Sequence, residues 1–238
     1  MESLENYKSS SNEKTTFLAR TYLWMFFALL LSAASSYFAA TDETLFNFVW
    51  RKGGYIFLFI GEFALVFVLS ALVRKLSAFS AALLFICYSI INGLTISSIF
   101  IRFQIDSIAY CFIGTALLFL VMSIYGFTTK QSLAKAGHYL MMALVGVIIV
   151  SILNGILTFA FGQDKTYFFI NELISIATVV IFTGLTAYDT QKILAASENA
   201  DGSESYKKLS ILAALELYLD FINIFLYLLR LFGNTRKN

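Results

Sequence analysis

The stretch SIAYCFIGTALLFLVMSIYGFTT, residues 107–129, contains no Asp, Glu, Lys or Arg. An α-helix needs about 20 mostly apolar residues to cross a membrane, so this stretch is typical of one membrane-spanning helix. Six further stretches have a similar length and apolar character: residues 21–41, 53–73, 76–101, 136–163, 166–188 and 209–229. We therefore predict an all-α integral membrane protein with seven transmembrane helices.

The composition supports a lipid environment. Hydrophobic residues make up 59% of the chain and charged residues 13%, whereas soluble domains carry about 25% charged residues. The net charge is +2 and the Lys and Arg residues are scattered, so nucleic-acid binding is not expected. Cys87 and Cys111 lie in apolar runs with no Cys or His nearby, and we predict that they are small buried residues and not metal ligands.

The connections between the apolar stretches are short, which predicts one seven-helix transmembrane domain over residues 21–232. A polar N-terminal tail, residues 1–20, precedes it, and a short C-terminal tail, residues 233–238, follows. Lys and Arg are more frequent in the connections that lie inside when the N-terminus is cytoplasmic, so we predict that orientation. The side of the C-terminus stays open, because it depends on whether the last stretch crosses the membrane fully.

Small residues inside the apolar stretches are expected to let helix backbones approach one another. They include the run at residues 32–36 and the glycines Gly93, Gly155 and Gly184. We predict that these residues serve helix packing and not hinges.

Two acids, Asp189 and Asp220, lie in the sixth and seventh helical segments. A carboxylate at membrane depth costs about 2.5–3.5 kcal/mol even on insertion scales, and usually faces a bundle interior or a cavity. If the segments end near Ala196 and begin near Ser210, the acids lie roughly 10 Å and 15 Å along their helices. Two close carboxylates share a proton, so we predict a pH-sensing or gating pair. Their oxygens also suit Ca²⁺, which makes Asp189 and Asp220 candidate metal ligands. A hydrogen bond that only joins two helices is the structural alternative.

Three more charges are candidates for an ion pathway or for coupling to this pair. Glu62 lies in the second stretch, roughly 18 Å before Arg74 along a helix. Glu216 is one helical turn before Asp220, so both can share a face. For Glu62, a purely structural pairing with a Tyr or an Arg is the alternative. We expect no cofactor. Ca²⁺ is predicted as the transported ion and is therefore not counted as a cofactor.

Two motifs, TGLTAYDTQK at 183–192 and ALELYLDFINIFL at 214–226, resemble the Bax inhibitor family, also called the transmembrane Bax-inhibitor-motif family, and its bacterial YccA-like branch. The resemblance covers nearly the whole chain after the N-terminal tail. It implies six helices around a central seventh, and an Asp189–Asp220 pair that senses pH on a Ca²⁺ leak. It also implies that Glu62 and Arg74 occupy the positions of a second-helix acid and base linked to the pair.

The resemblance further implies a role in stress response or cell-death suppression, modulation of a membrane protease, and location in a bacterial inner membrane. We therefore predict a pH-sensitive Ca²⁺ (cation) leak channel that is not an enzyme, with the lipid bilayer and Ca²⁺ or protons as partners. The main alternative is a membrane-embedded regulator that binds and inhibits a membrane protease or another membrane partner, with the N-terminal tail as the binding segment.

A remote alternative is an intramembrane aspartyl protease. Tyr188-Asp189 fits the first motif of that class. The second motif, Gly-x-Gly-Asp, reads Leu217-Tyr218-Leu219-Asp220 here and has no glycine to bring the backbone close to a substrate, which disfavours this alternative.

Overall fold

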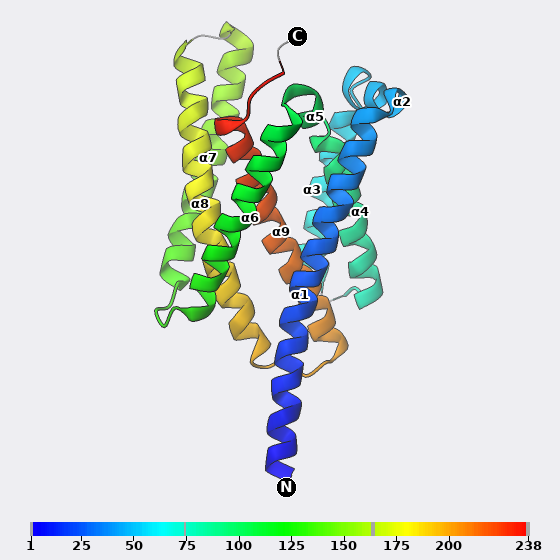
Figure 1. Cartoon of the computed structure of the whole chain (residues 1–238), viewed down its shortest axis with the longest axis vertical. Coiled ribbons are helices and arrows are strands. Elements are labelled where there is room, and N and C mark those ends of the chain that lie inside the picture. The colour runs from blue at the N-terminus through cyan, green and yellow to red at the C-terminus, as the bar shows by residue number, and fades with distance from the viewer. Residues whose placement is uncertain (1, 74, 163–164, 237–238) are drawn as a thin grey trace. The chain divides into compact units, whose positions relative to one another are not determined.

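The computed structural model describes residues 2–73, 75–162 and 165–236, with side chains from residue 12 onward except for residues 165–168. The predicted site residue Arg74 therefore lies outside the described residues. The described chain is almost entirely helical (Figure 1). Its elements are α1 Glu2–Thr41, α2 Glu43–Phe46, the π-helix η1 Asn47–Arg51, α3 Gly54–Leu72, α4 Ala78–Ile96, α5 Ile99–Arg102, α6 Ile105–Thr128, α7 Ala134–Phe161, α8 Lys165–Ser197 and α9 Glu204–Phe232.

Seven spans of the described chain are helical, long and apolar enough to cross a membrane. They lie in α1, α3, α4 with α5, α6, α7, α8 and α9, and each corresponds to one predicted stretch. Between residues 2 and 236, apart from the undescribed positions, no β-sheet forms, and one isolated antiparallel bridge pairs Phe103 with Thr235. The prediction of an all-α protein with seven helices that are long and apolar enough to cross a membrane is confirmed for the described residues.

Several buried hydroxyls bond to their own helices. A helix in lipid must satisfy its polar groups internally, since lipid offers no hydrogen-bond partners. The Thr21 hydroxyl donates to the carbonyl oxygen of Phe17 at 3.0 Å, and that of Thr186 donates to Phe182 at 2.8 Å. This bond to the preceding turn is what allows Ser and Thr to remain inside apolar spans.

The N-terminal ends of α3 and α4 are each determined by a local residue. Gly53 precedes α3 with a φ of 77°, a left-handed conformation that glycine adopts without steric cost. Ser77 caps α4, because its side-chain oxygen accepts a hydrogen bond from the Ser80 N–H at 3.0 Å.

The chain forms two compact units. The first comprises residues 1–104, 193–218 and 235–238, and the second comprises residues 105–192 and 219–234. Each contributes one of the groups of polar residues described below, and each is described by itself.

In the first unit, α1 and α4 pack very closely at Gly93. A Cβ atom at this position would overlap the Ser35 hydroxyl oxygen and the Ser32 carbonyl oxygen. The packing prediction is confirmed here, and also in the second unit at Gly184, where a Cβ atom would lie 2.6 Å from the Leu140 side chain. It is not borne out at Gly155, which has no atom of another segment within 4 Å of a Cβ position.

The core of the second unit lies between α8 and α9. Its buried members are Ile181, Phe182 and Leu185 of α8 and Ile224 of α9. Side chains from α6, α7 and both core helices cover this cluster: Leu118, Leu140, Leu144, Val147, Tyr188 and Leu228.

The C-terminal end of the chain pairs with the connection between α5 and α6. The backbone N–H of Arg236 donates to the Arg102 carbonyl at 3.0 Å, beside the Phe103–Thr235 bridge. Only the spans of α1, α3 and α4–α5 separate the N-terminus from this connection. Three crossings would reverse the side, so we predict that the C-terminus lies on the membrane face opposite the N-terminus.

Candidate functional site

Two residues next to Asp189 anchor α8 to its neighbours in the second unit. The Tyr188 ring lies against Gly137 of α7, where a Cβ atom would come within 2.6 Å of the ring. The Thr190 hydroxyl donates to the hydroxyl oxygen of Ser123 on α6 at 3.4 Å. These contacts fix the rotation of α8 about its axis.

Gln191 binds the connection between α6 and α7. Its Oε1 accepts from the backbone N–H of Leu133 at 2.8 Å, and its Nε2 donates to the carbonyl oxygen of Gln131 at 2.9 Å. The residues around Asp189 therefore hold α8 against three different segments, and this motif has a clear structural role in addition to its acid.

Asp189 has a cationic neighbour on its own helix. The Lys192 ammonium lies 3.9 Å from Asp189 Oδ1, one turn along α8. The Asp189 side chain is 14% exposed and that of Lys192 48%, so the lysine reaches outward while the acid stays inside. Sequence reasoning did not identify Lys192 as a partner, although its i,i+3 spacing was visible.

Asp220 is deeply buried, with 3% of its surface exposed. On α9, Ile224 follows Asp220 by one turn, and on α8, Leu185 and Phe182 precede Asp189 by one and two turns. Residues at these spacings share a helix face. Because Ile224, Leu185 and Phe182 belong to one apolar cluster, both acids extend from the faces that meet in it.

The positions of Asp189 and Asp220 along their helices, counted from the helix ends, estimate the depth of the two acids less well than the shared apolar cluster does. Asp189 lies about 12 Å before the end of α8, and Asp220 lies about 24 Å into α9, because α9 begins at Glu204 and not near Ser210. The reason is that the first residues of α9, Glu204–Lys208, are polar and extend the helix beyond its apolar part. Counted from Leu209, Asp220 lies about 16 Å in, close to the sequence-based value.

A metal centre with many protein ligands is not present in the described part of the chain. There, no three His, Cys, Asp or Glu side chains are grouped closely enough to hold a metal ion. Asp189 and Asp220 could supply only two carboxylates, so a cation between them would keep most of its water ligands.

A second polar group lies in the first unit and crosses four helices. Asn92 of α4 donates from Nδ2 to Glu62 Oε1 on α3 at 3.4 Å, and the Tyr218 hydroxyl of α9 donates to Asn92 Oδ1 at 2.8 Å. The hydroxyls of Tyr218 and Ser32, on α1, lie 2.7 Å apart. Ser32 also donates to the Ser89 carbonyl oxygen at 2.7 Å. Glu62 is therefore the end of a continuous hydrogen-bonded chain.

The sequence predicted this hydrogen-bonded chain only in part. The structure gives Glu62 hydrogen bonds with Asn92 and Thr95 of α4, and Asn92 relays the contact to Tyr218. The signals available in the sequence were a polar Asn92 in an apolar span and a Tyr inside the second motif. Glu216, the remaining predicted acid, is partly buried on α9 and belongs to the first unit.

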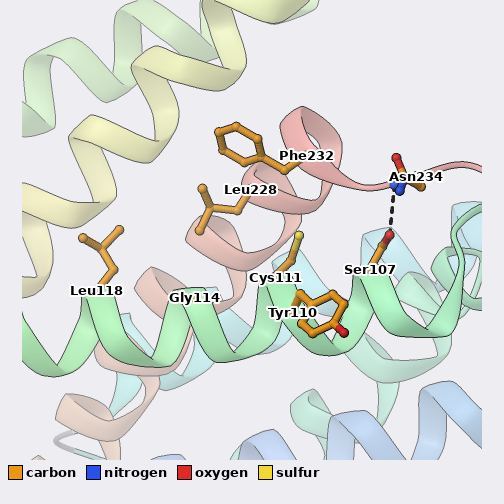
Figure 2. A pocket seen from close by; sticks show the side chains of 8 residues that line it. All are labelled: Ser107, Tyr110, Cys111, Gly114, Leu118, Leu228, Phe232 and Asn234. Carbon is orange, nitrogen blue, oxygen red and sulfur yellow. Dashed lines mark hydrogen bonds between the residues drawn. The ribbon is translucent and has the colours of Figure 1, made fainter.

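A cavity of about 510 Å³ lies beside α6 and the end of α9 in the second unit (Figure 2). Its wall is mainly apolar, and the Asn234 backbone N–H bonds to the Ser107 hydroxyl oxygen at 3.1 Å at one end. The lining residues are Ser107, Tyr110, Cys111, Gly114, Leu118, Leu228, Phe232 and Asn234. None is a predicted acid, so this cavity is separate from the candidate site.

Comparison with known proteins agrees with the two motifs. Residues 14–237 match the family described as "Inhibitor of apoptosis-promoting Bax1". The inner membrane protein YbhL of Escherichia coli (strain K12) is 42% identical over 224 residues, which cover 93% of this chain and 92% of YbhL. A Borreliella burgdorferi protein is 40% identical over 227 residues, 94% of each chain. A Rickettsia prowazekii protein is 35% identical over 222 residues, 92% of this chain and 90% of its own. The resemblance that the acid motifs suggested is thereby confirmed, and the chain belongs to the Bax inhibitor family.

Proposed function

We propose that this protein is a pH-sensitive leak channel for Ca²⁺ or a similar cation in a bacterial inner membrane, controlled by Asp189 and Asp220. The observation that carries the proposal is that both acids are buried or nearly so, in one compact unit, and extend from helix faces that meet in one apolar cluster. The location is supported by the name of the relative YbhL, an inner membrane protein.

The mechanism follows from the energetics of a carboxylate pair. Two neighbouring carboxylates cannot both ionise cheaply in a poorly solvated site, so they share one proton. Losing that proton replaces a hydrogen bond between α8 and α9 by repulsion, and separation of the helices opens a polar path. A divalent cation entering between the two carboxylates offsets the repulsion, which couples the passage of Ca²⁺ to the protonation of the pair.

The arrangement proposed for the transmembrane domain, residues 21–232, is six helices around α9 with a cytoplasmic N-terminus. The burial of α9 supports it: 67% of the residues in its most apolar stretch are buried, against 6–44% in the other six spans. A helix surrounded by protein can carry Asp220 and Glu216 at a smaller cost than a helix that faces lipid.

Ca²⁺ flux into proteoliposomes, measured from about pH 5 to about pH 8, tests this function for the wild type, Asp189→Asn and Asp220→Asn. The flux is expected to change with pH in the wild type and to lose this response in both variants. Asp106→Asn is a matched control, because it removes an exposed carboxylate at the start of α6, and it should keep the wild-type response. Folded wild-type protein that gives no flux above empty liposomes at any pH would rule the channel out.

The alternative is a regulator that binds a membrane protease through residues 1–20. Contacts of the N-terminal segment with the rest of the protein reduce the part of this segment that can bind a partner. Lys14 lies 3.7 Å from Glu198, and the rings of Phe17 and Tyr206 pack edge to face at 6.1 Å. Lys14 and Phe17 therefore contact other parts of the protein, and deletion of residues 2–11 is a cleaner test than deletion of the whole tail. A regulator would lose its effect on the protease in this deletion and keep its ion flux.

A further inference from the structure

The hydrogen-bonded chain of Glu62, Asn92, Tyr218 and Ser32, called the Glu62 chain below, contains three contacts that compete for two hydrogens. Ser32 must donate to the Ser89 carbonyl, which only accepts, and Tyr218 donates to Asn92 Oδ1. Neither hydroxyl then has a hydrogen left for the contact between them, although their oxygens lie 2.7 Å apart.

An ionised Glu62 causes this shortage of hydrogens in the Glu62 chain. A carboxylate can only accept hydrogen bonds, so the Asn92 amide must turn its NH₂ group toward Glu62 and its oxygen toward Tyr218. The phenol hydrogen of Tyr218 is thereby committed to Asn92, and the contact with Ser32 brings together two oxygens without a hydrogen between them.

A proton on Glu62 supplies the hydrogen that the contact between Tyr218 and Ser32 lacks. The carboxylic acid donates to Asn92 Oδ1 once the amide has rotated by half a turn, which exchanges its oxygen and nitrogen. Asn92 Nδ2 then donates to the Tyr218 oxygen, Tyr218 donates to Ser32, and Ser32 donates to Ser89. Each of the four contacts holds one hydrogen, and all donors point in one direction, which strengthens the bonds cooperatively.

We propose that Glu62 is a proton-binding site separate from the aspartate pair, and that its proton is reported through Asn92 and Tyr218 to Ser32 as a tighter contact between α9 and α1. The reaction is the uptake of one proton from water by the Glu62 carboxylate, and no other group changes its covalent state.

The groups around Glu62 fit this role. Its titratable neighbours are the phenols of Tyr88 on α4 and of Tyr218 on α9. Thr95 of α4 lies against the carboxyl as well, and Glu62 is the one charged residue in the sequence of α3. A carboxylate at mid-span costs about 2.5–3.5 kcal/mol on insertion scales, so the neutral acid is a natural state of this site.

Glu62→Gln tests the proposal because glutamine imitates the protonated acid: its amide donates to Asn92 Oδ1 at every pH. Infrared difference spectra of the protein in lipid, taken between about pH 4 and about pH 9, should show a carboxylic-acid C=O band in the wild type that Glu62→Gln removes. The band should persist in Asp189→Asn and Asp220→Asn, which separates this site from the proposed channel function. A band that survives Glu62→Gln unchanged would overturn the proposal.

The second measurement is the thermal unfolding midpoint at the two ends of that pH range. Glu62→Gln and Tyr218→Phe should lose the same part of the pH-dependent shift, Glu62→Gln by remaining in the acid-like state and Tyr218→Phe by breaking the chain. Phe85→Leu is the matched control, because the Phe85 ring packs on Tyr218 at 5.9 Å and carries no titratable group. An equal loss of the shift in Phe85→Leu would show a packing effect and contradict the proposal. If Tyr218→Phe does not fold, Ser32→Ala removes the last donor of the chain and takes its place.

Discussion

Tyr218 and Asp220 lie only two positions apart on α9, yet they belong to different groups of residues. Positions i and i+2 of a helix extend in different directions. Tyr218 is fully buried and completes the Glu62 chain in the first unit, whereas Asp220 extends toward the apolar cluster of the second unit. One short motif therefore serves two polar groups, and a substitution at either position is expected to disturb its own group first.

Asp201, in the connection between α8 and α9, provides a test at acidic pH. Hydrogen bonds from Ser203 hold the pKa of the Asp201 carboxyl below its ordinary value of 3.8, and its Oδ1 accepts from the Ser203 N–H at 2.9 Å. Since the pKa is lower in the folded state, the stabilisation is present above the unfolded value and is lost as the pH falls through the folded value. Protection of the Ser203 amide from hydrogen exchange, corrected for the intrinsic rate, should fall at that point.

Asp201→Ala should remove this protection already at neutral pH. The Lys207 amide, which donates to the Ser203 carbonyl at 3.0 Å, is the internal reference, because it reports on the first turn of α9. Equal Ser203 protection in the variant and the wild type would show that the carboxylate does not hold this connection.

The acids could be recognised from sequence and their partners could not, for a physical reason. A carboxylate inside an apolar run costs free energy wherever the run folds, so Asp189, Asp220 and Glu62 stand out without any structure. Asn92 and Ser32 carry no charge, and their roles depend on Tyr218, which is 126 and 186 residues away. Such contacts have no local signal.

At the scale of the helices, α1 packs very closely on α4. Gly93→Ala places a methyl group where the Ser32 backbone oxygen lies, and backbone cannot move aside as a flexible side chain can. We expect a loss of about 1–3 kcal/mol in the free energy of unfolding, the range for overpacked positions. Unfolding in detergent, followed by circular dichroism, measures it.

Gly146→Ala is the matched control for this prediction. Gly146 also lies within a span, in α7, but has nothing within 4 Å of a Cβ position. Alanine should therefore stabilise this helix by about 0.5–1 kcal/mol, because glycine loses more conformational freedom in a helix. Equal effects at both positions would contradict the close approach of α1 and α4.

The number and order of the helices followed from the sequence, while their exact ends did not. Spans are set by the length of apolar runs, which is a property of the sequence alone. The start of α9 was predicted too late because polar helix formers such as Glu204 and Lys207 continue a helix in water after the apolar run ends. For the same reason α1 begins at Glu2, within the polar N-terminal tail.

At the scale of the whole molecule, the pairing of the C-terminal end with the α5–α6 connection predicts that the two termini are on opposite sides of the membrane. In a background without Cys87 and Cys111, Lys8→Cys and Arg236→Cys place single thiols near the two ends. A membrane-impermeant maleimide applied to intact cells should label Arg236→Cys and should reach Lys8→Cys only after permeabilisation. Labelling of both positions from the same side would contradict the seven-span topology.

The position of Tyr218 so late in the chain has a consequence for biosynthesis. Asn92 and Tyr218 are 126 residues apart, and a ribosome adds about 5–20 residues per second. Tyr218 is therefore synthesised roughly 6–25 s after Asn92. During that interval Glu62, Asn92 and Ser32 are already in the membrane without the residue that links them. The nascent protein is therefore most vulnerable to membrane quality-control proteases just before its last helix is made, and variants that slow the insertion of α9 should lower the yield even when the finished protein is stable.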